Sequence, residues 1–295
     1  MKKFKIITDS ACDLNKKWRD ENDVAYAKMM ISWTDKNNVV HEEFASIDWD
    51  VLSLKEFYDI ERSGIRIFTA QVTIENYLAA FVPVLEKGED VLYIACSSGL
   101  SASLNTAKML ATNELQEKYP DNRVVVFDSL RAGMSQGGIV MRAVELQKEG
   151  KSLDEVVEIL ENEKRSYKEV GIPDNLIHLK RAGRVSAPAA YFGNIIGLKP
   201  ILVFDEKGSN LAKEKAIGKK AAYKRMAEMI KDDIVNPEEQ SIYLMHADCK
   251  KEDIDSFKNC ILEAVRVKEI IVEPLGPIIG ASSGPGTIIV NYIGK

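Results

Sequence analysis

The residues most suggestive of chemistry lie near the end of the chain, where residues 280–284 read GASSG and match the G-x-S-x-G pattern of serine hydrolases. In those enzymes the serine stands on a sharp turn between a strand and a helix, and a histidine follows it in the chain. Here Pro285 and the run TIIV follow Ser282 and indicate a strand, and the last histidine is His246. We therefore expect the glycine-rich stretch 276–286 to be a shaped loop rather than a nucleophile elbow.

Three other stretches share one form, in which an apolar run is followed by small hydroxyl residues and then by a helical pattern. They are IITDSACDL (6–14), FTAQVTIENY (68–77) and IACSSGLSASLNTA (94–107). Each hydroxyl could simply cap its helix. Together they favour a ligand site, because open α/β sheets bind ligands beyond the carboxyl ends of their strands and helix N-termini attract anions. Neutral hydroxyls and amides without an arginine suit a carboxylate better than a phosphate.

Composition and motifs exclude several other classes of function. The net charge of -5 argues against a surface built for nucleic acid. The chain has no P-loop, no G-x-G-x-x-G after a strand, no H-E-x-x-H and no C-x-x-C among its four cysteines, so we expect no cofactor and no metal. Its apolar runs are too short for a signal peptide or a membrane span, so we expect a cytoplasmic protein without membrane insertion.

Short β-branched runs alternate with helical patterns, which predicts the α/β class. The predicted strands are 4–9, 91–96, 123–128, 199–205, 241–246, 268–273 and 286–292. The predicted helices are 74–87, 101–118, 133–149, 153–169 and 219–234. We expect a mostly parallel sheet in an N-terminal domain, 1–150, and a mixed sheet in a C-terminal domain, 151–295, whose last strand runs antiparallel. The polar stretch 34–43 is predicted to be a hairpin or a loop.

Seven motifs occur in an order that resembles the DegV family over nearly the whole chain. They are TDSACDL, TAQV, SSGLSASLNTA, FDS, LKRAGRVS, GLKPIL and GPIIGASSGPG. The resemblance implies a two-domain α/β protein that binds a long-chain fatty acid between its domains. It also implies a carrier, not an enzyme, which presents the fatty acid to a separate fatty acid kinase for bacterial phospholipid synthesis.

The same resemblance implies roles for individual residues. Those expected to bind the carboxylate are Thr69, Ser97, Ser98, Gly99, Ser282 and Ser283. Those expected to dock the kinase or shape the domain interface are Lys180, Arg181 and Arg184. The chain departs from the family's motifs at Val72, Ser282 and Ile217, where the family carries proline, histidine and often arginine.

The tail pocket must be apolar, because the acyl chain supplies most of the affinity. Burial of about 14 methylenes, at about 0.8 kcal/mol each, stabilises the complex by on the order of 11 kcal/mol before the costs of association are subtracted. The residues predicted to line this pocket are Tyr191, Phe192, Ile195 and Ile278. Two alternatives stay open: a hydrolase or acyl transferase that uses Ser282 or Ser98, and a binding protein for another apolar carboxylate.

Overall fold

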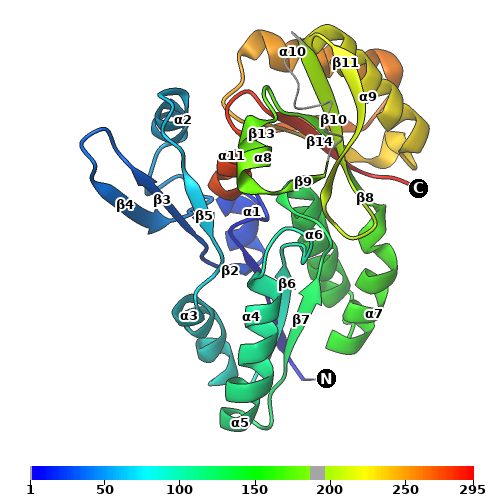
Figure 1. Ribbon diagram of the computed structural model, residues 1–295. Coiled ribbons are helices and arrows are strands. Elements are labelled where there is room, and N and C mark those ends of the chain that lie inside the picture. The colour runs from blue at the N-terminus through cyan, green and yellow to red at the C-terminus, as the bar shows by residue number, and fades with distance from the viewer. Residues whose placement is uncertain (1, 187–196) are drawn as a thin grey trace.

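The computed structural model describes residues 2–186 and 197–295, and it consists of two stacked α/β units with a small third sheet beside them (Figure 1). The first unit is built on a four-stranded sheet in which every pair of neighbours is parallel. Its strands, in spatial order, are β2 (Ala25–Ala27), β1 (Phe4–Asp9), β6 (Asp90–Ala95) and β7 (Val124–Asp128). All six residues of β6 are buried, as expected for a parallel strand covered on both faces.

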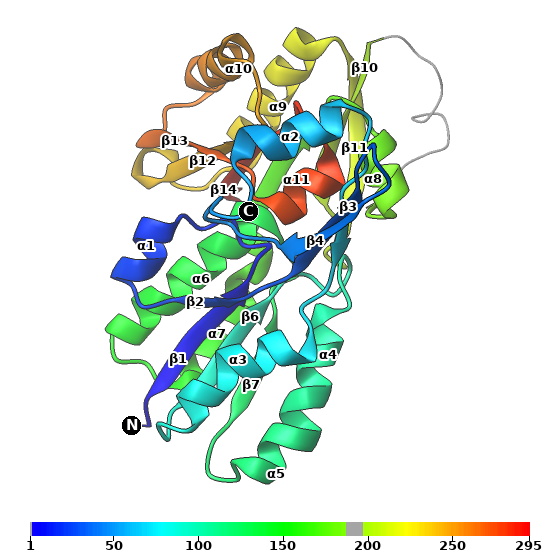
Figure 2. The same ribbon diagram turned by 90° about the vertical axis from the view of Figure 1, so that its left-hand side faces the viewer.

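Helices cover this sheet. Helix α3 (Ile74–Leu85) packs against β2 and β6, and α4 (Ser103–Leu110) packs against β7. A π-helical turn (Ala111–Leu115) and α5 (Gln116–Lys118) continue α4. Helix α6 (Gly133–Lys148) packs against β1 and β6, with α7 (Leu153–Glu163) beside it and the short α1 (Lys16–Glu21) at the edge (Figure 2).

A three-stranded antiparallel sheet projects from the first unit. Its order is β4 (Val40–Phe44), β3 (Met30–Thr34) and β5 (Phe68–Ala70), and α2 (Leu54–Arg62) connects β4 to β5. The predicted hairpin over 34–43 is confirmed as the tip of β3 and β4. Strand β5 was not predicted, and it matters for the site because its pairing with β3 places Thr69 opposite Ile31.

The second unit is built on a seven-stranded mixed sheet. Its strands, in spatial order, are β13 (Glu269–Pro274), β12 (Ser241–His246), β14 (Ile288–Ile293), β8 (Tyr167–Ile172), β10 (Leu198–Phe204), β11 (Asn210–Ile217) and β9 (Val185–Ser186). Helix α10 (Lys251–Ala264) connects the parallel strands β12 and β13, and the predicted antiparallel last strand β14 is confirmed. Helices α9 (Lys219–Asp233) and α10 share one buried core with the outer face of this sheet.

The inner face of the mixed sheet belongs to the other core. Tyr167 on β8 and Met245 on β12 join the buried cluster of the first unit, and α6 contacts β1, β6, β8 and β14. Because α6 packs against both sheets, its contacts do not separate two domains at residue 150, and that domain boundary stays a prediction. Within the described residues, no helix combines the length and the apolar character needed to cross a membrane.

Two predicted elements were wrong. The helix over 153–169 ends at Glu163, and the chain then forms a 3-10 turn and strand β8, because Val170 and Ile172 join the sheet core. The glycine-rich stretch 276–286 is not a loop: residues Pro277–Ser283 form helix α11, which lies between the two units (Figure 1). Proline suits the first turn of a helix, and Gly284, with φ of 82°, ends it.

Candidate functional site

A cavity of about 250 Å³ lies between the two units. On the first unit it is bounded by β5, the loop after β6 and the start of α6, and on the second by the inner face of β8, β10 and β14. Helix α11 crosses one wall. The cavity therefore lies beyond the carboxyl end of the parallel strand β6, where open α/β sheets bind their ligands.

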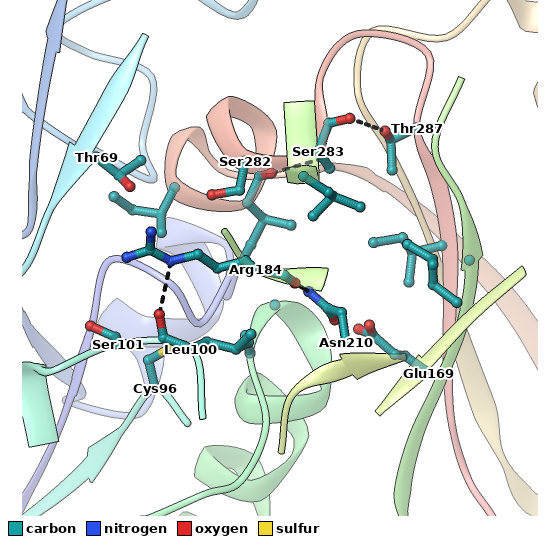
Figure 3. Close-up of a pocket in the computed structure, with 18 of the residues that line it drawn as sticks. Thr69, Cys96, Leu100, Ser101, Glu169, Arg184, Asn210, Ser282, Ser283 and Thr287 are labelled. Carbon is teal, nitrogen blue, oxygen red and sulfur yellow. Dashed lines mark hydrogen bonds between the residues drawn. The ribbon is translucent and has the colours of Figure 1, made fainter. Parts of the chain in front are cut away.

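Polar groups gather at one end of the cavity. Figure 3 shows Thr69 of β5 and Ser282 of α11 around the guanidinium of Arg184, with Ser101 on the far side of that guanidinium. Among the described residues, neither the Thr69 hydroxyl nor the Ser282 hydroxyl has a hydrogen-bond partner within the protein. Both can therefore donate to an anion.

Arg184 reaches this end because of how α8 (Ile177–Ala182) finishes. Gly183 adopts a left-handed conformation, with φ of 68°, and turns the chain back over the cavity. The Arg184 Nε donates to the carbonyl of Leu100 at 3.1 Å, and Nη1 donates to the carbonyl of Ala182. Within the described part of the chain Nη2 has no acceptor, so the guanidinium keeps donors for a carboxylate.

Two contacts fix α11 and with it Ser282. The Asp13 carboxylate accepts from the Gly276 amide at 3.1 Å at the start of the helix. Gly280 allows the helix to lie against Tyr58, since a Cβ at this position would come within 2.5 Å of the Tyr58 hydroxyl. Ser283, in contrast to Ser282, donates to the carbonyl of Ile279 at 2.8 Å, so its hydroxyl is engaged although it lines the cavity.

The loop after β6 contributes different residues from those predicted. Ser97 is buried and donates to the carbonyl of Gly208 at 2.8 Å, whereas Ser98 is exposed and Gly99 lies against Lys207. These three residues do not line the cavity, because the turn directs them toward the β10–β11 connection. The residues of this loop that do line it are Cys96, Leu100, Ser101 and Ala102.

Asp9 holds this loop in place. Its carboxylate accepts from the Cys96 amide at 2.8 Å, the Tyr93 hydroxyl at 2.9 Å and the Gln136 side chain at 3.1 Å. It thereby joins the ends of β1 and β6 to α6. Burial raises the pKa of Asp9, and these hydrogen bonds oppose the shift. The TDSACDL motif thus builds the frame of the site.

Apolar side chains form the rest of the cavity wall. The predicted Ile278 is among them, together with Ile172, Leu179, Leu202, Phe204, Ile279 and Ile289. The other three residues predicted for the tail, Tyr191, Phe192 and Ile195, lie outside the described residues. Gly171 on β8 widens the cavity at its inner wall, where a Cβ would come within 2.8 Å of the Ile289 side chain.

Glu169 is the one acidic residue that lines this cavity among those described. It lies at the end opposite Thr69 and Ser282 (Figure 3). Burial raises its pKa to about 8, and the guanidinium of Arg131 opposes the shift. The sequence did not single out Glu169 because its segment was assigned to a helix; the alternation of Val170 and Ile172 was the available signal for a strand.

The three residues predicted to dock a partner separate in space. Lys180 and Arg181 are exposed on α8, and the carbonyl of Arg181 accepts from Arg66 at 2.7 Å. Arg184 lies at the cavity instead.

The serine hydrolase alternative would need a histidine beside Ser282. No hydrogen bond joins Ser282 to a histidine in the described chain; the nearby His178 packs against Gly284 and lies 3.8 Å from the Glu61 carboxylate.

Comparisons with known proteins agree with this architecture. A model of the family described as "Uncharacterised protein, DegV family" matches residues 3–295. A DegV domain-containing protein of Clostridium perfringens is 36% identical over 294 residues, covering 100% of this chain and 98% of the relative.

Two solved structures are similar to the whole chain. A DegV family protein from Thermus thermophilus, described for its fatty acid binding, has a TM-score of 0.84 at 26% identity and covers 99% of this chain and 100% of its own. DegV of Bacillus subtilis, described as a fatty acid binding protein, has a TM-score of 0.82 at 24% identity, with both chains covered fully. At the latter identity the similarity concerns the fold.

Proposed function

The chain belongs to the DegV family, and from this premise we propose that it binds a long-chain fatty acid in the cavity between its two α/β units. The observation that carries the proposal is the polarity of that cavity. Thr69, Ser282 and Arg184 gather at one end, and aliphatic side chains line the walls beyond them (Figure 3). The Thermus thermophilus relative, described for its fatty acid binding, supports the same ligand class.

The head group requires more than hydroxyls. A carboxylate that leaves water costs several kcal/mol unless hydrogen bonds replace its hydration. The hydroxyls of Thr69 and Ser282 supply two donors, and the guanidinium of Arg184 adds a charge-assisted one. A hydrogen bond to a charged group contributes about 1.5–3 kcal/mol. We therefore assign to Arg184 the carboxylate-binding role, in place of partner docking.

The tail supplies the affinity. Each buried methylene stabilises the complex by about 0.8 kcal/mol, and the ordering of the chain consumes part of that gain. At about 250 Å³, the cavity is slightly smaller than the roughly 300–1,000 Å³ usual for ligand pockets. We propose that the acyl chain runs from Arg184 past Ile278 and Leu202 toward β8.

We further propose that the protein is a cytoplasmic carrier that presents its fatty acid to a separate kinase for phospholipid synthesis, as the family resemblance implies. The exposed Lys180 and Arg181 on α8 lie near Arg184 in the chain and are our candidates for that contact. With a bacterial fatty acid kinase present, Arg181→Ser should lower the rate of acyl phosphate formation and leave fatty acid affinity unchanged. An unchanged rate would remove Arg181 from the interface.

Substitutions at the polar end test the head-group assignment. Displacement of a fluorescent fatty acid by palmitate should show a Kd raised about tenfold to a hundredfold in Arg184→Met and about threefold to tenfold in Ser282→Ala. Ser98→Ala is the matched control, since Ser98 is an exposed serine outside the cavity, and its Kd should equal that of the wild type. A loss of affinity in Ser98→Ala but not in Ser282→Ala would contradict the assignment.

The two alternatives give different results. An esterase or acyl transferase would turn over ester substrates and lose that activity in Ser282→Ala. A protein specific for another apolar carboxylate would bind palmitate weakly in every variant, so that Arg184→Met would cause little further loss.

A further inference from the structure

The end of the cavity away from Thr69 holds a polar group that fatty acid binding does not use, the half-buried Glu169, which also lines the neighbouring polar pocket around Arg131 and Arg165. Strand β8 places Glu169 and Gly171 on the same face, because side chains alternate along a strand. In Figure 3 the Glu169 carboxyl points into the cavity from the side opposite Thr69 and Ser282. An unbranched alkyl chain offers nothing to which this carboxyl could bind.

The protein supplies Glu169 with few partners. Within the described chain, no group donates a hydrogen bond to its carboxyl. Arg131, whose charge acts on Glu169, is itself buried and donates to the carbonyls of Leu130 at 2.7 Å and Arg165 at 2.9 Å. It also donates to the carbonyl of Tyr167, so three of its N–H groups are engaged by backbone carbonyls.

The surroundings favour the neutral acid. Phe204 lines the cavity with Glu169, and the guanidinium of Arg131 lies over that ring at 5.2 Å. Burial keeps the pKa of Glu169 at about 8, so the carboxyl is protonated at neutral pH. A protonated carboxyl offers one O–H donor and a carbonyl acceptor, which is the complement of an alcohol.

A second polar residue lies near this end. Asn210 on β11 lines the same cavity, and its Nδ2 donates to the carbonyl of Arg184 at 2.9 Å. Its amide oxygen has no donor among the described residues. Gly171 keeps the wall between Glu169 and the rest of the cavity open, because it has no side chain.

We propose that this cavity selects acyl chains that carry a hydroxyl group on the tail, and that Glu169 is the residue that recognises it. The inference rests on the proposed fatty acid function and specifies its ligand class. Arg184 binds the carboxylate and Glu169 binds the hydroxyl, so the position of the hydroxyl along the chain is selected as well. A site built to hydrogen-bond a hydroxyl discriminates against the ligand that lacks it, because the alkyl chain then covers the polar group and leaves it unpaired.

The test compares stearic acid with a set of eighteen-carbon acids that each carry one hydroxyl, at successive positions along the second half of the chain. We expect the wild-type protein to bind one of these acids about tenfold more tightly than stearic acid, with weaker preferences at the neighbouring positions. Glu169→Leu should abolish that preference and bind stearic acid at least as tightly as the wild type. Glu169→Gln, which retains a donor and an acceptor, should keep part of the preference.

Glu206→Gln is the control, because Glu206 is an acid with a highly exposed side chain on the turn between β10 and β11. This variant should prefer the same hydroxylated acid as the wild type, to the same extent. The absence of a preference at every hydroxyl position would overturn the inference, as would a preference that persists in Glu169→Leu. If Glu169→Leu does not fold, the affinities of the wild type and of Glu169→Gln for the same set of acids still test the inference. Failure of all the acids to bind, stearic acid included, would overturn the proposed function itself.

Discussion

The buried carboxyl of Glu61 should contribute stability at acid pH that is lost as the pH rises to neutral. Glu61 lies on α2, and its side chain is 1% exposed. One of its carboxyl oxygens has no hydrogen-bond partner. Burial raises its pKa from the ordinary value of 4.5 to about 8, and Arg62 only partly opposes the shift. Burial and the nearby Arg181 and Arg66 lower the pKa of the neighbouring His178, so both partners are neutral at pH 7.

The magnitude follows from proton linkage. The unfolded chain loses the Glu61 proton near pH 4.5, whereas the folded protein keeps it until about pH 8. Between these values folding takes up a proton, and the free energy of unfolding falls by about 1.4 kcal/mol per pH unit. This contribution is fully present below pH 4.5 and is lost as the pH rises through 8. From about pH 5.5 to about pH 7 the loss due to Glu61 is roughly 2 kcal/mol.

Urea unfolding of the wild type and of Glu61→Gln at these two pH values measures the effect. Between these pH values the unfolding free energy of the wild type should decrease by roughly 2 kcal/mol relative to that of the variant, since glutamine does not titrate. All other groups contribute equally to both proteins, and the exposed Glu206→Gln should match the wild type. An equal change in wild type and Glu61→Gln would show instead that Glu61 is ionised in the folded state.

Three further predictions concern the site and its frame. Gly171→Leu should fill the inner cavity and shift the preferred acyl chain to shorter lengths, with about a fourfold loss of affinity for each methylene displaced; an unchanged chain-length profile would place the tail elsewhere. Asp13→Ala leaves the Gly276 amide unpaired and should lower the unfolding free energy by about 1–3 kcal/mol, with weaker palmitate binding, whereas Asp13→Asn should retain both. Gly284→Ala should destabilise the protein by about 2 kcal/mol or more in urea unfolding, because φ is 82° and the new Cβ would lie 2.5 Å from the His178 ring; equal stability would show that the turn relaxes.

The parts of the fold that the sequence predicted share a simple pattern. Buried parallel strands such as β1 and β6 are short runs rich in apolar β-branched and aromatic residues, and α9 has the pattern of a helix with one apolar face. Strand β11 was missed because its sequence, NLAKEKAI, alternates charged and apolar residues on a partly exposed strand. Strand β8 was missed because helix-forming Lys168 and Glu169 lie beside its core residues, and sheet pairing overrode their local preference.

Part of the candidate site could also be predicted from the sequence. The motifs identified the DegV family, and the structure brings Thr69, Ser282 and Ile278 to one cavity, although their roles remain predictions. It could not be predicted that the turn after β6 directs Ser98 outward, because that depends on long-range contacts of its neighbour Ser97 with Gly208. The positions of Arg184 and Glu169 at the cavity could not be predicted either, because they depend on the turn at Gly183 and on the pairing of β8 in the sheet.

Native mass spectrometry of the protein as it is purified, followed by release and identification of any bound molecule, tests fatty acid binding most directly. We expect a long-chain fatty acid at close to one molecule per chain, and a marked loss of occupancy in Arg184→Met but not in Ser98→Ala. A protein that carries no acyl chain, and that takes up neither palmitic nor stearic acid when they are added, would contradict fatty acid binding.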